Sequence, residues 1–77
     1  MSIDEFIVFF KTLFVFSKEF VEEWTPETEF RYLDDWSSLM ALEFIVKCQS
    51  ELGKTVIPSE MKKTETLQEL YDLVFAN

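Results

Sequence analysis

The chain has 77 residues and carries fifteen acidic and seven basic side chains, for a net charge of −8. This length predicts one small domain over residues 1–77, which needs a core dense in apolar groups. The absence of His, with a single Cys and a single Gly, excludes His-dependent catalysis, a disulfide framework and glycine-rich phosphate loops. The acidic balance argues against nucleic-acid binding, which begins with neutralised phosphates.

The first predicted element is a helix over residues 3–15. Ser2 and Glu5 have the spacing of a capping box, and the apolar side chains behind them cover almost the whole circumference. Such a helix is either deeply packed or has a second contact, so the Phe-rich first helix is a candidate surface for a partner or a homodimer. Residues 6–16 are too short to span a bilayer and lack signal-peptide flanks. The lack of such a targeting pattern, together with the lone Cys48, favours a cytoplasmic location.

A long acidic loop is predicted at residues 24–35, after a short turn at residues 17–23 that Ser17 caps. A loop of this length in a small domain is usually functional or anchored. Trp24 and Trp36 are expected to cover the core rather than to bind a ligand. Three side chains are expected to hold the loop on the helices: Phe30, Tyr32 and Leu33.

The second main helix is predicted to start at Ser37 or Ser38 and to run to about Leu52, with Gly53 as its left-handed cap. Cys48 is expected to be a small buried apolar residue. Apolar spacing predicts an inner face made of Leu39, Leu42, Ile45, Val46 and Gln49, with Met40 and Phe44 beside it.

The C-terminal third is predicted to hold a short helix and a last main helix. An extended link at residues 56–58 precedes a short helix that starts at Ser59 and ends near Lys63. Thr66 and Glu69 form a second capping box, which opens the last helix. Its inner face is predicted to be Leu67, Leu70, Tyr71 and Val74. The sequence therefore predicts an all-α fold with three main helices, one short helix and one long loop.

Ser37 and Ser38 are the main candidates for chemistry. The simplest interpretation is an N-cap that satisfies free amides of the second helix. The functional interpretation is an exposed Ser at a helix N-terminus, where the helix dipole favours an attached phosphate. Because the chain has no His, neither Ser is a self-activated nucleophile. An external enzyme has to modify it, and the chain itself is not expected to be an enzyme or, from the spacing of its acids, to bind a metal.

The order of these parts resembles the acyl carrier protein family, including peptidyl carriers, over nearly the whole chain. Each matching segment is weak alone, but the four occur in the family's order with compatible spacings. They are TPETEF (residues 25–30), LDDWSSL (33–39), VIPSE (56–60) and TLQEL (66–70). The resemblance implies an acyl-carrier-like four-helix bundle with a short third helix.

The resemblance also implies a covalent cofactor. A phosphopantetheinyl transferase is expected to move 4′-phosphopantetheine from coenzyme A onto Ser38, the Ser before the Leu. The thiol of this arm carries acyl or aminoacyl intermediates as thioesters, which raises their effective concentration at partner enzymes. Ser37 stands where the family commonly has Asp, so Ser37 is a minor rival site, and an unmodified chain remains an alternative.

The expected partners are the transferase and acyl-activating, acyltransferase or synthase enzymes. The residues expected to contact them are Asp34, Asp35, Leu39, Met40 and Glu43. Met40 stands at a surface position where an acid is frequent in the family, which favours a more hydrophobic docking surface and a specialised biosynthetic pathway. The competing hypothesis is an unmodified helical interaction module that binds a partner through the first or second helix.

Overall fold

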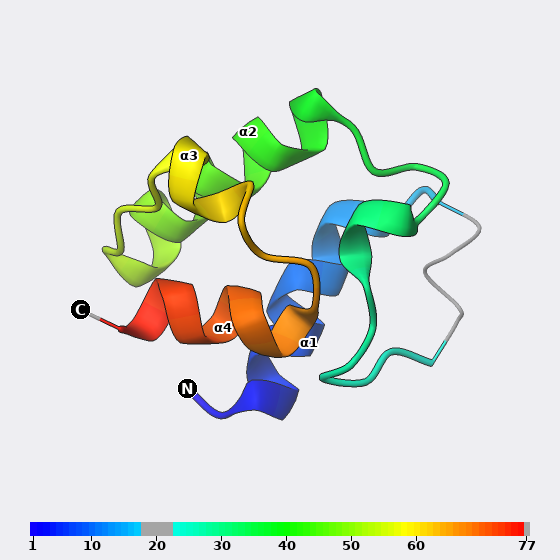
Figure 1. Ribbon diagram of the computed structural model, residues 1–77, viewed down its shortest axis with the longest axis horizontal. Coiled ribbons are helices and arrows are strands. Elements are labelled where there is room, and N and C mark those ends of the chain that lie inside the picture. Colours follow the sequence, from blue (N-terminus) through cyan, green and yellow to red (C-terminus); the bar gives the residue numbers. More distant parts are fainter. Residues whose placement is uncertain (18–22, 77) are drawn as a thin grey trace.

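Helices form nearly all the regular structure of the computed structural model, which describes residues 1–17 and 23–76 (Figure 1). The elements are α1 (Ile3–Lys11), the 3-10 turn η1 (Thr12–Phe14), the 3-10 turn η3 (Phe30–Tyr32), α2 (Ser38–Lys47), the π-helical turn η4 (Cys48–Leu52), α3 (Pro58–Met61) and α4 (Leu67–Phe75). The described residues contain no β-strand, so the all-α prediction is confirmed. Most of the turn predicted at residues 17–23 falls outside the described part of the chain.

Both predicted capping boxes are present. The Ser2 hydroxyl accepts from the Glu5 amide at 3.2 Å, and the Ser2 amide donates to the Glu5 carboxylate at 2.9 Å. Thr66 and Glu69 exchange the same two bonds at the start of α4. These amide donors stabilise the charged carboxylates and hold the pKa of Glu5 and of Glu69 below its usual range.

The first helix is shorter than predicted. α1 ends at Lys11, and the chain tightens into η1, because the Thr12 hydroxyl donates to the Phe9 carbonyl at 2.6 Å and closes the turn there. The apolar side chains predicted to surround this helix are only partly packed. Val8 is largely exposed on α1, and Phe16, which follows η1, is fully exposed.

The extent of the second helix is as predicted, but most of its predicted inner face is wrong, since only Ile45 of the five predicted residues packs against the core. α2 continues through η4 to Leu52, and Gly53 closes it with a φ of +65° in the left-handed region. The buried residues are Phe44 and Cys48, with Met40, Ala41 and Ile45 packed against the core, whereas Leu39, Leu42 and Val46 are exposed. The ring of Phe44 has the largest apolar surface on α2, and burying it turns most of the predicted stripe toward solvent.

The short helix starts one residue earlier and ends sooner than predicted. Pro58 is its first residue, which suits a side chain that fixes φ and has no amide proton to satisfy. α3 ends at Met61, and α4 then follows with Leu67, Leu70 and Val74 buried as predicted. Tyr71 is half-buried, and its hydroxyl lies within hydrogen-bond distance of the Met1 carbonyl.

The loop between α1 and α2 is anchored on the start of α4 rather than left free. The Leu67 amide donates to the Thr28 carbonyl at 3.0 Å, and the Gln68 amide donates to the Pro26 carbonyl at 2.8 Å. Phe30 is buried and Leu33 packs against the core, as predicted for this loop. Tyr32 is 72% exposed, so its predicted anchoring role is wrong.

Aromatic rings fill the centre of the fold. Phe10 of α1 has no exposed surface, and its ring centroid lies 5.2 Å from that of Phe44 and 5.7 Å from that of Phe30. Trp24 and Trp36 are partly buried and pack on Phe10, which confirms that they cover the core. Among the helices of residues 1–17 and 23–76, none has the length and apolar character needed to cross a membrane.

Candidate functional site

The two serines at the start of α2 have different environments. Ser37 is the N-cap in an extended conformation, and its hydroxyl accepts from the Met40 amide at 3.2 Å. Ser38 is the first residue of α2 and is exposed. Its hydroxyl forms no hydrogen bond within the described residues. The N-cap interpretation therefore holds for Ser37, and the exposed hydroxyl at the helix N-terminus belongs to Ser38.

The acidic residues predicted near this site lie on the surface. Asp34 and Asp35 are exposed in the turn before α2, and Glu43 is exposed on α2. The Ser17 hydroxyl donates to the Asp35 carboxylate, which ties the turn before α2 to the segment after η1. The structure thus groups Asp34 and Asp35 next to the serines, with Glu43 further along the helix.

Of the two apolar residues predicted to meet partners, only Leu39 is on the surface. Leu39 is 64% exposed, whereas Met40 is half-buried and packs against the core. The exposed apolar side chains of α2 are instead Leu39, Leu42 and Val46, at 57–64% exposure. The i, i+4 run of Met40, Phe44 and Cys48 was the signal in the sequence that points to the true inner face.

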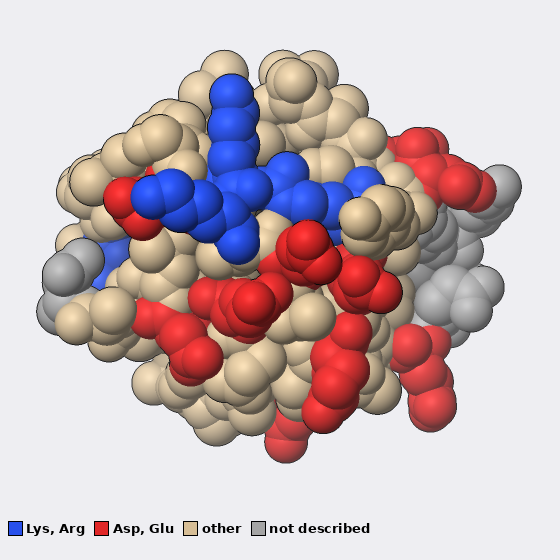
Figure 2. Space-filling model, in the orientation of Figure 1, with Lys and Arg blue, Asp and Glu red and all other residues tan. Residues whose placement is uncertain are grey.

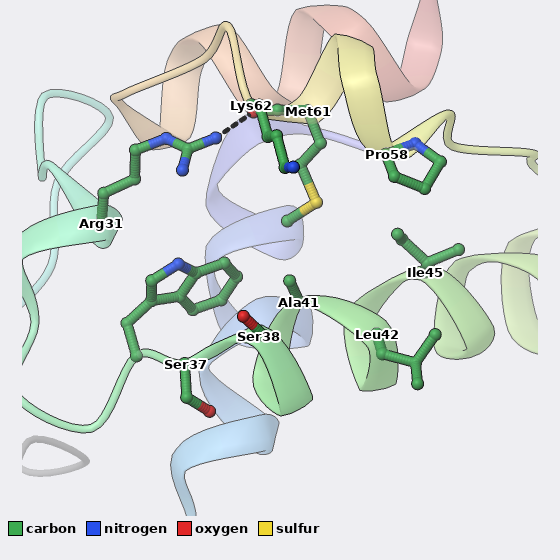
Figure 3. Close-up of a pocket in the computed structure, with 10 residues that line it drawn as sticks. Arg31, Ser37, Ser38, Ala41, Leu42, Ile45, Pro58, Met61 and Lys62 are labelled. Carbon is green, nitrogen blue, oxygen red and sulfur yellow. Dashed lines mark hydrogen bonds between the residues drawn. The ribbon is translucent and has the colours of Figure 1, made fainter.

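A pocket of about 540 Å³ opens between α2 and α3 beside Ser38 (Figure 3). Its polar lining consists of Arg31, Ser37, Ser38 and Lys62, and its apolar lining consists of Trp36, Ala41, Leu42, Ile45, Pro58 and Met61. The serines come from the start of α2, and the two cations lie toward α3 on the other side of the pocket. Periodicity along one helix carries no signal for this pocket, because it depends on how α3 approaches α2.

Arg31 holds the loop against the third helix. Its Nε donates to the Thr64 carbonyl and its Nη2 donates to the Met61 carbonyl. Met61 ends α3, where carbonyl groups lack partners within the helix. Thr64 is buried, and its hydroxyl also donates to the Met61 carbonyl, at 2.7 Å. Arg31 therefore fixes one wall of the pocket, a role that the sequence did not suggest.

Cys48 is buried within the core, as predicted, and is expected to be unreactive. Burial among apolar side chains raises its pKa to about 12, because the thiolate is poorly solvated there. Labelling by iodoacetamide at neutral pH should be more than about a hundredfold slower in the native protein than in denaturant. Native and denatured rates close to each other, measured by intact mass, would contradict this placement.

The described residues contain no group of three or more Cys, Asp or Glu side chains arranged to hold a metal ion. The chain matches no family model, and no curated protein and no solved structure is detectably similar to it. Function must therefore be inferred from the site itself.

Proposed function

We propose that this chain is an acyl or aminoacyl carrier that holds its cargo on a 4′-phosphopantetheine arm attached to Ser38. The observation that carries the proposal is the exposed Ser38 hydroxyl at the N-terminus of the ten-residue helix α2, beside an apolar pocket. Ser37 is the weaker candidate because its hydroxyl already caps the helix. The resemblance of LDDWSSL and the three other segments to carrier proteins supports the same residue.

The attachment chemistry places one demand on the chain, which is an accessible hydroxyl. In this proposal Ser38 Oγ forms a bond to the phosphorus next to pantetheine, the pyrophosphate bond of coenzyme A breaks, and adenosine 3′,5′-bisphosphate leaves. The hydroxyl proton passes to a base of the transferase, since the chain has no His. The N-terminus of α2 favours the attached phosphate by about 0.3–1 kcal/mol. The thiol supplied by the arm is the group that carries thioesters.

The surface around Ser38 fits recognition by other proteins. Leu39 and Leu42 offer exposed apolar contacts, and Asp34, Asp35 and Glu43 offer charge to basic partner surfaces. These apolar side chains replace Met40 as the basis for the proposed hydrophobic docking surface and specialised pathway. The partners in this proposal are the transferase and the acyl-activating, acyltransferase or synthase enzymes.

The test is intact-protein mass after incubation with coenzyme A, Mg²⁺ and a promiscuous phosphopantetheinyl transferase. We expect the mass of one phosphopantetheine to be added to the wild type and to Ser37→Ala, and none to Ser38→Ala. Ser37→Ala is the matched control, because it removes an adjacent hydroxyl and costs about 1 kcal/mol of helix capping. No gain with several transferases on folded protein would refute the carrier proposal.

The exposed apolar residues of α2 also support the second candidate, an unmodified helical interaction module. Leu39, Leu42 and Val46 lie on the surface of one helix, and such a row suits a partner groove or helix. The two candidates predict different results in the mass experiment, because an unmodified interaction module would show no increase in mass with coenzyme A and the transferase.

A further inference from the structure

The pocket beside Ser38 has a cationic edge. Arg31 and Lys62 are two of the ten residues that line it, and no acidic residue is among them. Figure 2 shows Lys and Arg gathered in a band across the part of the surface where α3 lies, with Asp and Glu gathered along the side of α4. A chain with fifteen acids and seven bases thus places two of its bases at its pocket.

Both of these cations lack a carboxylate partner in the part of the chain that the structure describes. In residues 1–17 and 23–76, neither Arg31 nor Lys62 forms an ion pair, although the adjacent Lys63 pairs with Glu60 at 3.7 Å. Arg31 uses Nε and Nη2 on the carbonyls of residues 64 and 61, so its guanidinium is held in place while the two N–H groups of Nη1 stay available to a ligand.

We propose that the pocket binds an aliphatic chain whose free end is a carboxylate, so that the cargo of this carrier is a dicarboxylic acyl group bound as its monothioester. The methylene groups contact the apolar wall formed by Ala41, Leu42 and Ile45, and the free carboxylate meets Arg31 and Lys62. A methyl end placed there displaces water from two cations and returns no polar contact, whereas a carboxylate makes charge-assisted hydrogen bonds. The pocket volume lies in the range of small-molecule sites.

Binding to the pocket is tested first on the unmodified protein, where it does not depend on the proposed function. The probes are hexanoate and hexanamide, which share a chain length and differ in charge, and the readout is the shift of the amide resonances of residues 31, 41, 42 and 62. We expect hexanoate to bind at least about fivefold more tightly than hexanamide, as for one partly exposed charge pair. Equal affinities would overturn the proposal.

Lys62→Gln and Lys63→Gln form a matched pair for this titration. Lys62 lines the pocket and has no ion pair in the described residues, whereas Lys63 does not line it and pairs with Glu60. Each variant removes one positive charge from a neighbouring exposed position. The preference for hexanoate should fall in Lys62→Gln, where Arg31 is the one cation left in the pocket lining, and persist in Lys63→Gln. An equal loss in both variants would mean that only the general charge of this face matters, and the carboxylate site would be refuted.

The covalent form rests on the proposed function and is tested by loading Ser38 from adipoyl-coenzyme A or hexanoyl-coenzyme A. Adipoyl should shift the amides of residues 31 and 62 beyond the shifts caused by the unloaded arm, and hexanoyl should not. If the arm alone gives the full shift, the anion at the cations is the phosphodiester on Ser38, and the dicarboxylic cargo is refuted. Failure to load at all refutes the carrier proposal, and the hexanoate titration then decides the pocket separately.

Discussion

Replacing Phe10 with alanine is expected to remove most of the stability of the fold. The side chain is fully buried, and its ring packs against those of Phe14, Trp24, Phe30, Trp36 and Phe44 at centroid distances of 5.2–5.9 Å. Truncating a buried Phe typically costs about 3–5 kcal/mol, while a domain holds about 0.05–0.15 kcal/mol per residue in total. Denaturant unfolding followed by tryptophan fluorescence measures the loss.

Phe16→Ala is the matched control for this prediction. Phe16 follows η1 and is 101% exposed, so the same truncation should change the free energy of unfolding by less than about 0.5 kcal/mol. Phe10→Leu should fall between the two, because it keeps part of the apolar volume but none of the aromatic contacts. Equal effects of Phe10→Ala and Phe16→Ala would show that the aromatic cluster is not the core of the fold.

Local signals in the sequence predicted the starts of α1 and α4 and the end of η4. A Ser or Thr followed three residues later by Glu satisfies helix amides from within four residues, and Gly53 adopts the positive φ that other residues avoid. These features depend only on near neighbours along the chain. Tertiary context does not alter them, which is why both capping boxes and the glycine cap are found where they were expected.

The orientation of α2 was not predictable in the same way. Two overlapping apolar stripes run along this helix, one through Leu39, Leu42 and Val46 and the other through Phe44 and Cys48. Apolar spacing alone does not rank them. The aromatic rings of α1 determine which stripe is buried, because Phe44 fits among Phe rings and carries more apolar surface than Leu. Because of this error the predicted docking surface included Met40, which is half-buried, and left out Leu42, which is exposed.

The candidate site was predicted in part, since the serines lie at the helix start as expected, but its pocket was not. Ser38 could be named because α2 begins at a recognisable cap. Arg31 and Lys62 are separated from Ser38 by 7 and 24 positions in the chain. They meet at the pocket only because the loop before α2 is anchored on α3 and α4. Contacts of this kind between distant segments leave no periodic signal.

Arg31→Ala should destabilise the protein by about 2–3 kcal/mol and loosen α3. The guanidinium donates to the carbonyls of Met61 and Thr64, and a hydrogen bond to a charged group contributes about 1.5–3 kcal/mol. The Met61 carbonyl keeps the amide and hydroxyl of Thr64 as donors, so the loss comes mainly from the bond to the Thr64 carbonyl. Arg31→Lys should recover only part of this, because an ammonium lacks the planar fork that reaches two carbonyls at once. Denaturant unfolding gives the stability, and amide hydrogen exchange of residues 61–64 gives the local loosening.

Lys63→Ala is the control for Arg31→Ala, because it removes one positive charge close by and only a surface ion pair with Glu60. That pair is worth less than about 1 kcal/mol. If both variants lose the same stability, charge rather than the two carbonyl bonds accounts for the effect of Arg31. If Arg31→Ala alone speeds exchange at residues 61–64, the Arg31 side chain holds the end of α3 in place, and this side chain also lines the pocket. The width of the pocket then depends on a residue from the loop, so changes in that loop are expected to alter what binds beside Ser38.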